Sequence, residues 1–195
     1  MKYDRYKRIV HGGIALAVTL QLLSEQLMRP LRPGKPVPDS IESAFFIVHE
    51  YIGFVVLIFV GLRLMSLLDE GNDERDRLFP WLTVAGRALL MHELRYEVPQ
   101  WLRGKLKPPN EKNITAATVH GLGLCLALGM GLSGMALFIS TNADGSMTAP
   151  VKFIRECHEI MGTTMWVFLI GHVSMAIAHQ LTGHRALQRI FNLSP

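Results

Sequence analysis

Cysteine is scarce in this chain of 195 residues, which contains only Cys125 and Cys157. Each of the two lies inside an apolar stretch, so we interpret both as small buried residues. Two cysteines are too few for a disulfide framework, which excludes a small secreted fold held together by disulfide bonds.

Charged residues are absent from long parts of the chain. They make up 18% of it, but they concentrate in residues 1–8, 29–42, 69–112 and 182–189. This segregation, together with 49% hydrophobic residues, is typical of a polytopic membrane protein. The sequence pI near 9.3 does not indicate a nucleic-acid-binding protein, because the excess of Lys and Arg flanks the apolar segments.

Four apolar segments, at residues 9–28, 44–68, 114–139 and 156–180, are each long enough to cross ~30 Å of hydrocarbon as an α-helix. They lack the alternation of polar and apolar residues that barrel strands require. The first segment follows a basic N-terminus, as in a signal peptide, but no small-residue cleavage site follows it and we expect a retained helix. The sequence therefore predicts an all-α fold: one domain over residues 1–195, built as a polytopic membrane four-helix bundle.

Lysine and arginine are concentrated in the N-terminus, the loop between the second and third segments, and the C-terminal tail. By the positive-inside rule, both termini and this loop are expected in the cytoplasm. Six residues of the loop recur at near-helical spacing: Leu78, Trp81, Leu82, Ala85, Leu89 and Leu90. With Trp101 and interspersed arginines, they predict an amphipathic cytoplasmic helix in the headgroup layer. A docking surface for a soluble partner, or a solvated linker, is the alternative.

Histidines are concentrated in the apolar segments. Six of the eight lie at or within them: His11, His49, His120, His158, His172 and His179. Ionisable residues inside a membrane are costly and usually functional, although a single histidine could instead hydrogen-bond a neighbouring helix. Six together favour a functional interpretation.

The depths of four histidines form two pairs. His158 and His172 are 14 residues apart in the last segment, about 21 Å along a helix and within roughly 40° of one face. The predicted orientation brings His49 to the level of His158 on the periplasmic side. It brings His11 to the level of His172 on the cytoplasmic side. The pairs 11/172 and 49/158 predict two metal centres stacked across the bilayer.

Two neutral imidazoles from opposing helices suit a six-coordinate haem iron. Zinc would need further protein ligands, and a proton relay would leave the equal depths unexplained. The sequence C-x-x-C-H is absent, so the haem would be b-type and not covalently attached. Arg63, Arg155 and Lys152 are candidate contacts for haem propionates or other anions, with interfacial anchoring as the alternative, favoured for Arg63.

These features resemble the prokaryotic cytochrome b561 superfamily, which includes the b-type subunits of nickel–iron hydrogenases and formate dehydrogenases. One histidine opens the first segment in RIVHGG, one lies early in the second in FIVHEYIG, and His-x13-His runs along the fourth. The resemblance covers nearly the whole chain. It implies a bacterial inner-membrane cytochrome with two haem b groups, whose iron has the axial ligands His11, His49, His158 and His172.

The resemblance also implies a function, electron transfer across the bilayer between quinone and a periplasmic redox protein or dehydrogenase subunit. The quinone would bind near the cytoplasmic haem, with Asn113, His120 and His179 as candidate contacts. A helix cap at Asn113 and interhelical hydrogen bonds at the two histidines are the alternatives. Membrane lipid is a further partner, and a homodimer is possible.

A second function from another class is a stand-alone superoxide:quinone oxidoreductase, so the chain could be an electron-transfer subunit or an enzyme. Arg32, Arg155 and Lys152 would then attract the superoxide anion. A haem-free transporter that uses histidines for proton coupling is disfavoured, because the sequence shows no inverted repeat.

Overall fold

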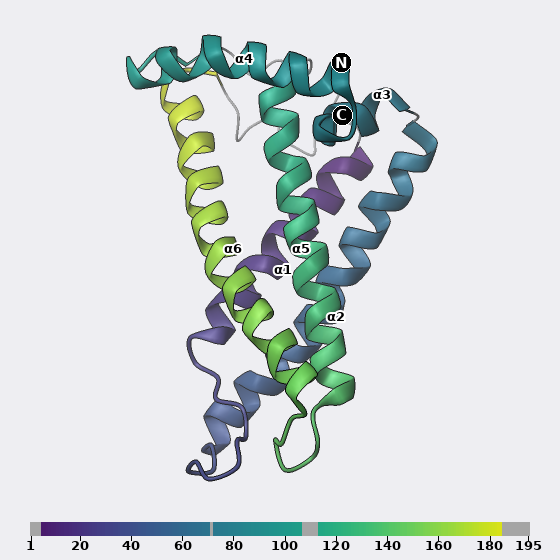
Figure 1. Cartoon of the computed structure of the whole chain (residues 1–195). Helices are drawn as coiled ribbons and strands as arrows, with labels where there is room; N and C mark the ends of the chain where they lie inside the picture. The colour runs from purple at the N-terminus through teal and green to yellow at the C-terminus, as the bar shows by residue number, and fades with distance from the viewer. Residues whose placement is uncertain (1–4, 71, 107–112, 185–195) are drawn as a thin grey trace. The chain divides into compact units, whose positions relative to one another are not determined.

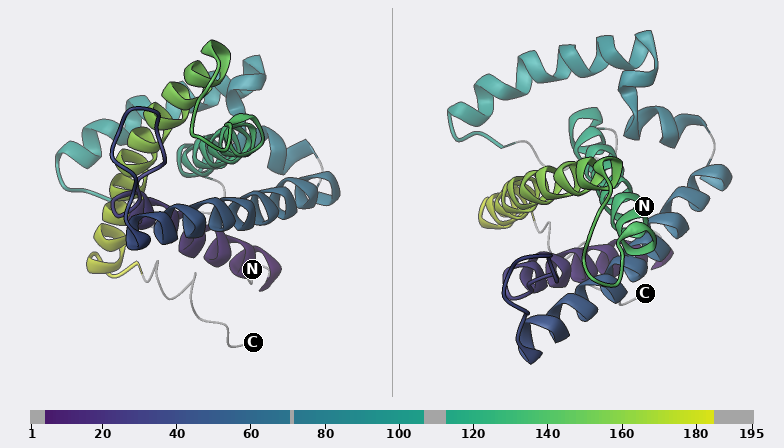
Figure 2. Two further views of the ribbon diagram at one scale, coloured as in Figure 1. Left: turned by 90° about the horizontal axis from the view of Figure 1, so that it is seen from below. Right: turned by 60° about the horizontal axis from the view of Figure 1, so that its bottom comes forward.

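The computed structural model describes residues 5–70, 72–106 and 113–184, and over these residues the chain is helical with no strand. Figure 1 shows the elements in chain order, and Figure 2 shows the long helices as unbroken ribbons. Their bounds are α1 Arg5–Glu25, α2 Ser40–Glu70, α3 Asn72–Leu78, the 3-10 helix η1 Pro80–Leu82, α4 Val84–Leu102, α5 Ile114–Ser140 and α6 Ala149–Leu181. The predicted all-α class is confirmed.

Three stretches are long and apolar enough to cross a membrane: Ser40–Asp69, Ile114–Ser140 and Ala149–Leu181. They expose large apolar side chains, such as Ile139 at 73% and Val167 at 70%, which suits contact with lipid. The fourth predicted span, residues 9–28, corresponds to α1, which begins with the basic RYKR and ends earlier, at Glu25. Among the described residues, α1 is not one of the helices that are long and apolar enough to cross a membrane, so this crossing stays a prediction.

The described residues form two compact units. Unit 1 comprises those within Met1–Arg8, Arg63–Cys125 and Phe168–Pro195, and unit 2 those within Ile9–Leu62 and Leu126–Val167. Each of the four long helices contributes residues to both units.

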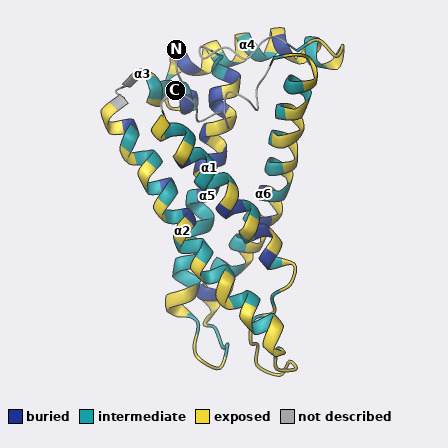
Figure 3. Ribbon diagram, turned by 180° about the vertical axis from the view of Figure 1, so that it is seen from behind, coloured by how far each residue is buried: buried dark blue, intermediate teal, exposed yellow. Residues whose placement is uncertain are grey.

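The core of unit 2 joins α1 to α2. Val10 and Leu22 of α1 and Val60 of α2 are almost fully buried. Figure 3 colours the buried positions of the helices dark blue. Gly13 permits this approach, because a Cβ there would clash with the ring of Phe59. Close helix packing through small residues is the usual arrangement in membrane bundles.

In unit 1 the segment that follows α2 packs against α5. A Cβ at Gly121 of α5 would clash with the carbonyl oxygen of Leu78, at the end of α3. The next turn ends in Thr83, whose hydroxyl accepts a hydrogen bond from the Gly86 amide at 3.0 Å and caps α4. The loop in which the sequence predicted a helix therefore contains one, α4. Its contact with lipid headgroups stays a prediction.

Candidate functional site

His49 on α2 and His158 on α6 lie next to each other within unit 2. Their ring centres are 6.4 Å apart, and the ring planes meet at 79°. The two rings are neighbours because α2 and α6 each carry a histidine on the face that is turned toward the other helix. The predicted 49/158 pair therefore consists of residues that lie close enough to share one ligand.

The Nδ1 atoms of both rings have hydrogen-bond partners. Nδ1 of His49 lies 3.2 Å from the carbonyl oxygen of Gln21 and 3.1 Å from Oγ of Ser24, both on α1. Nδ1 of His158 lies 2.8 Å from Oγ of Ser133 on α5. Neither serine was expected from the sequence to contact a histidine, although a polar residue inside an apolar helix is itself a signal of an interhelical contact.

The spacing of this pair suits one metal ion. With about 2.0 Å from the metal to each imidazole nitrogen, and about 1.1 Å from nitrogen to ring centre, two ligands in line place their ring centres about 6.2 Å apart. The observed 6.4 Å is close to that value. Gly134 on α5 keeps the neighbourhood open, because a Cβ there would lie 3.3 Å from Cε1 of His158. Two neutral nitrogen donors of this kind fit haem iron.

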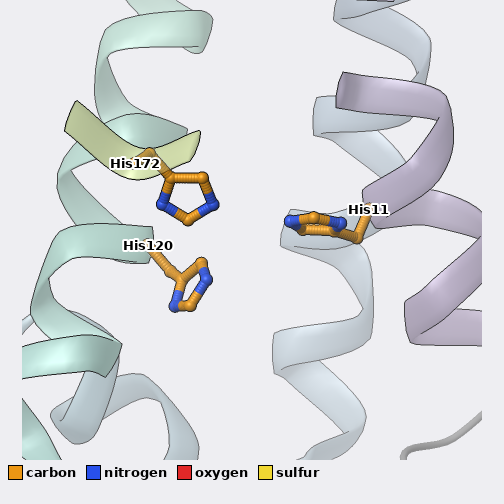
Figure 4. Close-up of side chains that lie close together, drawn as sticks. All are labelled: His11, His120 and His172. Carbon is orange, nitrogen blue, oxygen red and sulfur yellow. The ribbon is translucent and has the colours of Figure 1, made fainter. Parts of the chain in front are cut away.

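A second pair of imidazoles lies in unit 1. His120 on α5 and His172 on α6 have ring centres 5.2 Å apart at 79°. Figure 4 draws both side chains. Phe168, one turn before His172, stacks on its ring at 5.5 Å and 14°. The sequence had suggested His120 only as a quinone contact, and the structure brings it beside a predicted haem ligand.

His11 is the remaining predicted ligand and is also drawn in Figure 4, on α1. It belongs to unit 2, whereas His172 belongs to unit 1. The 11/172 pair therefore stays a prediction.

Asn113 caps α5, the alternative that the sequence left open. Its Oδ1 accepts from the Ala116 amide at 2.6 Å, and its Nδ2 donates to Oε1 of Glu97 on α4 at 2.7 Å. Glu93, one turn earlier on α4, accepts from the amide and the hydroxyl of Thr115 at 2.8 and 2.9 Å. Two carboxylates of α4 thus bind the N-terminus of α5, where the helix dipole favours negative charge.

His179, the third candidate quinone contact, lies beside His184 in unit 1. Their Nδ1 atoms are 3.1 Å apart, and the hydroxyl of Thr182 lies 3.1 Å from Nδ1 of His184. The neighbour of His179 is thus a residue that follows α6 directly. This local contact gives no indication of a bound quinone.

Arg63, a candidate propionate contact, lies in an ion-pair cluster. Glu74 of α3 lies 3.3 Å from Arg63, 3.0 Å from Arg77 and 3.8 Å from Lys7. Arg63 also donates to the hydroxyl of Ser66 at 2.7 Å. The sequence did not single out Glu74, because one acid in a charged loop gives no sign of its partners.

The candidate anion contacts of unit 2 differ in their surroundings. Arg155 and Arg32 lie 3.5 and 3.6 Å from the same carboxylate oxygen of Glu159. Lys152 is exposed. In the turn before α6, hydrogen bonds from the side chain and the amide of Ser146 hold the pKa of the Asp144 carboxyl below its usual value.

The chain was compared with known proteins. The family described as prokaryotic cytochrome b561 matches residues 2–193, nearly the whole chain. No curated protein and no solved structure matches it.

Proposed function

The chain belongs to the prokaryotic cytochrome b561 family, and from that premise we propose that it is a di-haem cytochrome linking quinone to a periplasmic redox partner across the bacterial inner membrane. Family membership makes the chain a membrane b-type cytochrome of electron transfer. The number of haems, the quinone and the periplasmic partner belong to the proposal.

The observation that carries the proposal is the pair formed by His49 and His158. Their 6.4 Å separation would suit two imidazoles that hold one iron, and both Nδ1 atoms have other partners. When bound, haem supplies reversible one-electron transfer, while the protein holds the iron and sets its potential. His49 and His158 would hold one haem by their Nε2 atoms.

The second haem would be held by His172 with His11. The stacked ring of Phe168 confines the orientation of His172, which a ligand to a fixed metal needs. His120, 5.2 Å from His172, would then lie beside the haem edge and could donate a hydrogen bond to bound quinone. Asn113 binds Glu97 and His179 lies beside His184, so a quinone at either residue would compete with these contacts.

The proposed topology is a single domain with four membrane crossings, in which α1 is the first and both termini are cytoplasmic. The three longer apolar helices support three of the crossings. The basic residues of α4, among them Arg87 and Arg95, support a cytoplasmic position for the loop that contains it.

The alternative activity, superoxide:quinone oxidoreduction, requires a positive surface that attracts the anion. Arg32 and Arg155 both contact Glu159, which lowers their positive field. Electron transfer to a separate redox partner is therefore the function that we favour.

Rapid mixing of the purified, haem-loaded protein with quinol and with superoxide distinguishes the two activities. We expect quinol to transfer electrons to the haem in the absence of oxygen, followed by the haem absorbance. We expect superoxide to react slowly. Haem reduction by superoxide near the diffusion limit of about 10⁹ M⁻¹s⁻¹ would instead support the enzyme. No reduction by any quinol would contradict the quinone link.

A further inference from the structure

The acceptors that face the two Nδ1 atoms of the His49–His158 pair differ in kind. His49 faces a backbone carbonyl, that of Gln21, at 3.2 Å and the hydroxyl of Ser24 at 3.1 Å. His158 faces the hydroxyl of Ser133 at 2.8 Å. All five residues belong to unit 2.

The hydrogen-bond partners of His49 determine which of its two ring nitrogens carries the proton. A carbonyl oxygen can only accept a hydrogen bond, so Nδ1 of His49 must donate to Gln21. The hydroxyl of Ser24 donates its one hydrogen to the same carbonyl at 2.8 Å, which leaves its oxygen as a second acceptor. Nε2 of His49 is therefore the unprotonated nitrogen, the form that binds a metal.

The same reasoning applies to His158. The hydroxyl of Ser133 donates to the carbonyl of Met130, one turn earlier on α5, at 3.0 Å. Its oxygen is then the acceptor for the N–H of His158. Nε2 of His158 is left with its lone pair.

We propose that Ser133 is a positioning residue: it fixes the tautomer of His158 and lowers the midpoint potential of the haem held by His49 and His158. The inference rests on the proposed function, because it concerns a bound haem. An acceptor at Nδ1–H raises the basicity of a histidine ligand, and a more basic ligand favours ferric over ferrous iron. Ser133 is also the contact that a side-chain substitution can remove, whereas the carbonyl of Gln21 stays in place.

The test is a potentiometric titration of haem absorbance in purified Ser133→Ala protein. We expect one of two redox components to move to higher potential while the other stays unchanged. A tenfold loss of preference for ferric iron corresponds to an upward shift of 59 mV for a one-electron couple. Ser133→Thr, which keeps the hydroxyl, should return the wild-type potential.

Ser24→Ala is the matched control. It removes a hydroxyl at a similar distance from the other imidazole, but it leaves the carbonyl of Gln21 as acceptor. The upward shift of potential in this variant should therefore be smaller than in Ser133→Ala.

Three results would overturn the role of Ser133: unchanged potentials in Ser133→Ala with full haem content, an equal shift in Ser24→Ala, or failure of Ser133→Thr to restore the potential. If Ser133→Ala loses its haem, Ser133→Cys decides, because a thiol is a weaker acceptor and should give a smaller upward shift. Unchanged potentials in Ser133→Cys would then overturn it. Wild-type protein without haem would instead overturn the proposed function, so the two failures are distinguishable.

Discussion

At the scale of single residues, His158 and His172 of α6 have different surroundings. His158 has a hydroxyl at its Nδ1 and a facing imidazole at 6.4 Å. His172 has a phenyl ring stacked on it and a second imidazole at 5.2 Å. A polar acceptor raises the basicity of a histidine ligand, and a stacked aromatic ring restricts its orientation. The two predicted haem ligands therefore differ in the groups that contact each ring.

Replacement of one ligand tests the pairing. In His158→Ala the proposed haem between α2 and α6 loses an axial nitrogen, while His11 and His172 keep theirs. We expect the haem-to-protein ratio to fall by about half, measured by pyridine haemochrome absorbance, because metal sites rarely survive the loss of a ligand. His92→Ala, in the exposed part of α4, is the control and should keep the wild-type ratio. Equal loss of both haems in correctly folded His158→Ala protein would contradict the pairing.

At the scale of elements, α4 is attached to α5 through its acidic face. Glu93 and Glu97 are four residues apart, so they lie on one side of α4. Glu97 is only 4% exposed, and both carboxylates bind groups at the start of α5. Carboxylates there satisfy amides that a helix leaves unpaired. This attachment positions the helix that would lie closest to a cytoplasmic partner or to the headgroup layer.

Removal of one carboxylate tests this attachment. Glu93→Ala leaves the amide and hydroxyl of Thr115 without their acceptor, at a cost of about 1 kcal/mol. In a chain of this size that corresponds to a decrease in Tm of about 2–4 °C, measured by thermal unfolding in detergent. Glu156→Ala, at an exposed position of α6, should leave Tm unchanged. Equal melting temperatures for the two variants would contradict the proposed attachment.

The helices could be predicted from sequence because membrane insertion depends on local hydropathy. Residues 114–139 were expected to be helical, and α5 spans Ile114–Ser140. The predicted span 156–180 is shorter than α6, which begins at Ala149, because a helix can continue through polar residues beyond the hydrocarbon. In the loop between residues 68 and 114, Pro80 begins η1 and α4 follows from Val84, close to the residues that the sequence placed at helical spacing.

The contacts between helices could not be predicted in the same way. Ser133 contacts His158 25 residues away, Glu74 contacts Arg63 11 residues away, and Glu93 contacts Thr115 22 residues away. Nothing local in the sequence identifies these three partners. His49 and His158 could be matched by depth, because the helical rise converts sequence distance into height. Depth alone did not identify His120 as a neighbour of His172. Rotation of a helix about its axis depends on packing, which spacing does not reveal.

At the scale of the whole molecule, the chain is a membrane b-type cytochrome that would carry two haems at different depths. The family match over residues 2–193 supports the cytochrome, and the His49–His158 geometry supports one of the two haem sites. Continuous helices suit this role, because a ligand fixed on a rigid helix holds its metal with little rearrangement between oxidation states.

The most direct test of the account is the haem content of the purified wild-type chain. Pyridine haemochrome absorbance, normalised to protein by amino-acid analysis, should give two b-type haems per chain. A ratio of one haem per chain would contradict the two-centre account, and the absence of b-type haem would contradict the whole proposal.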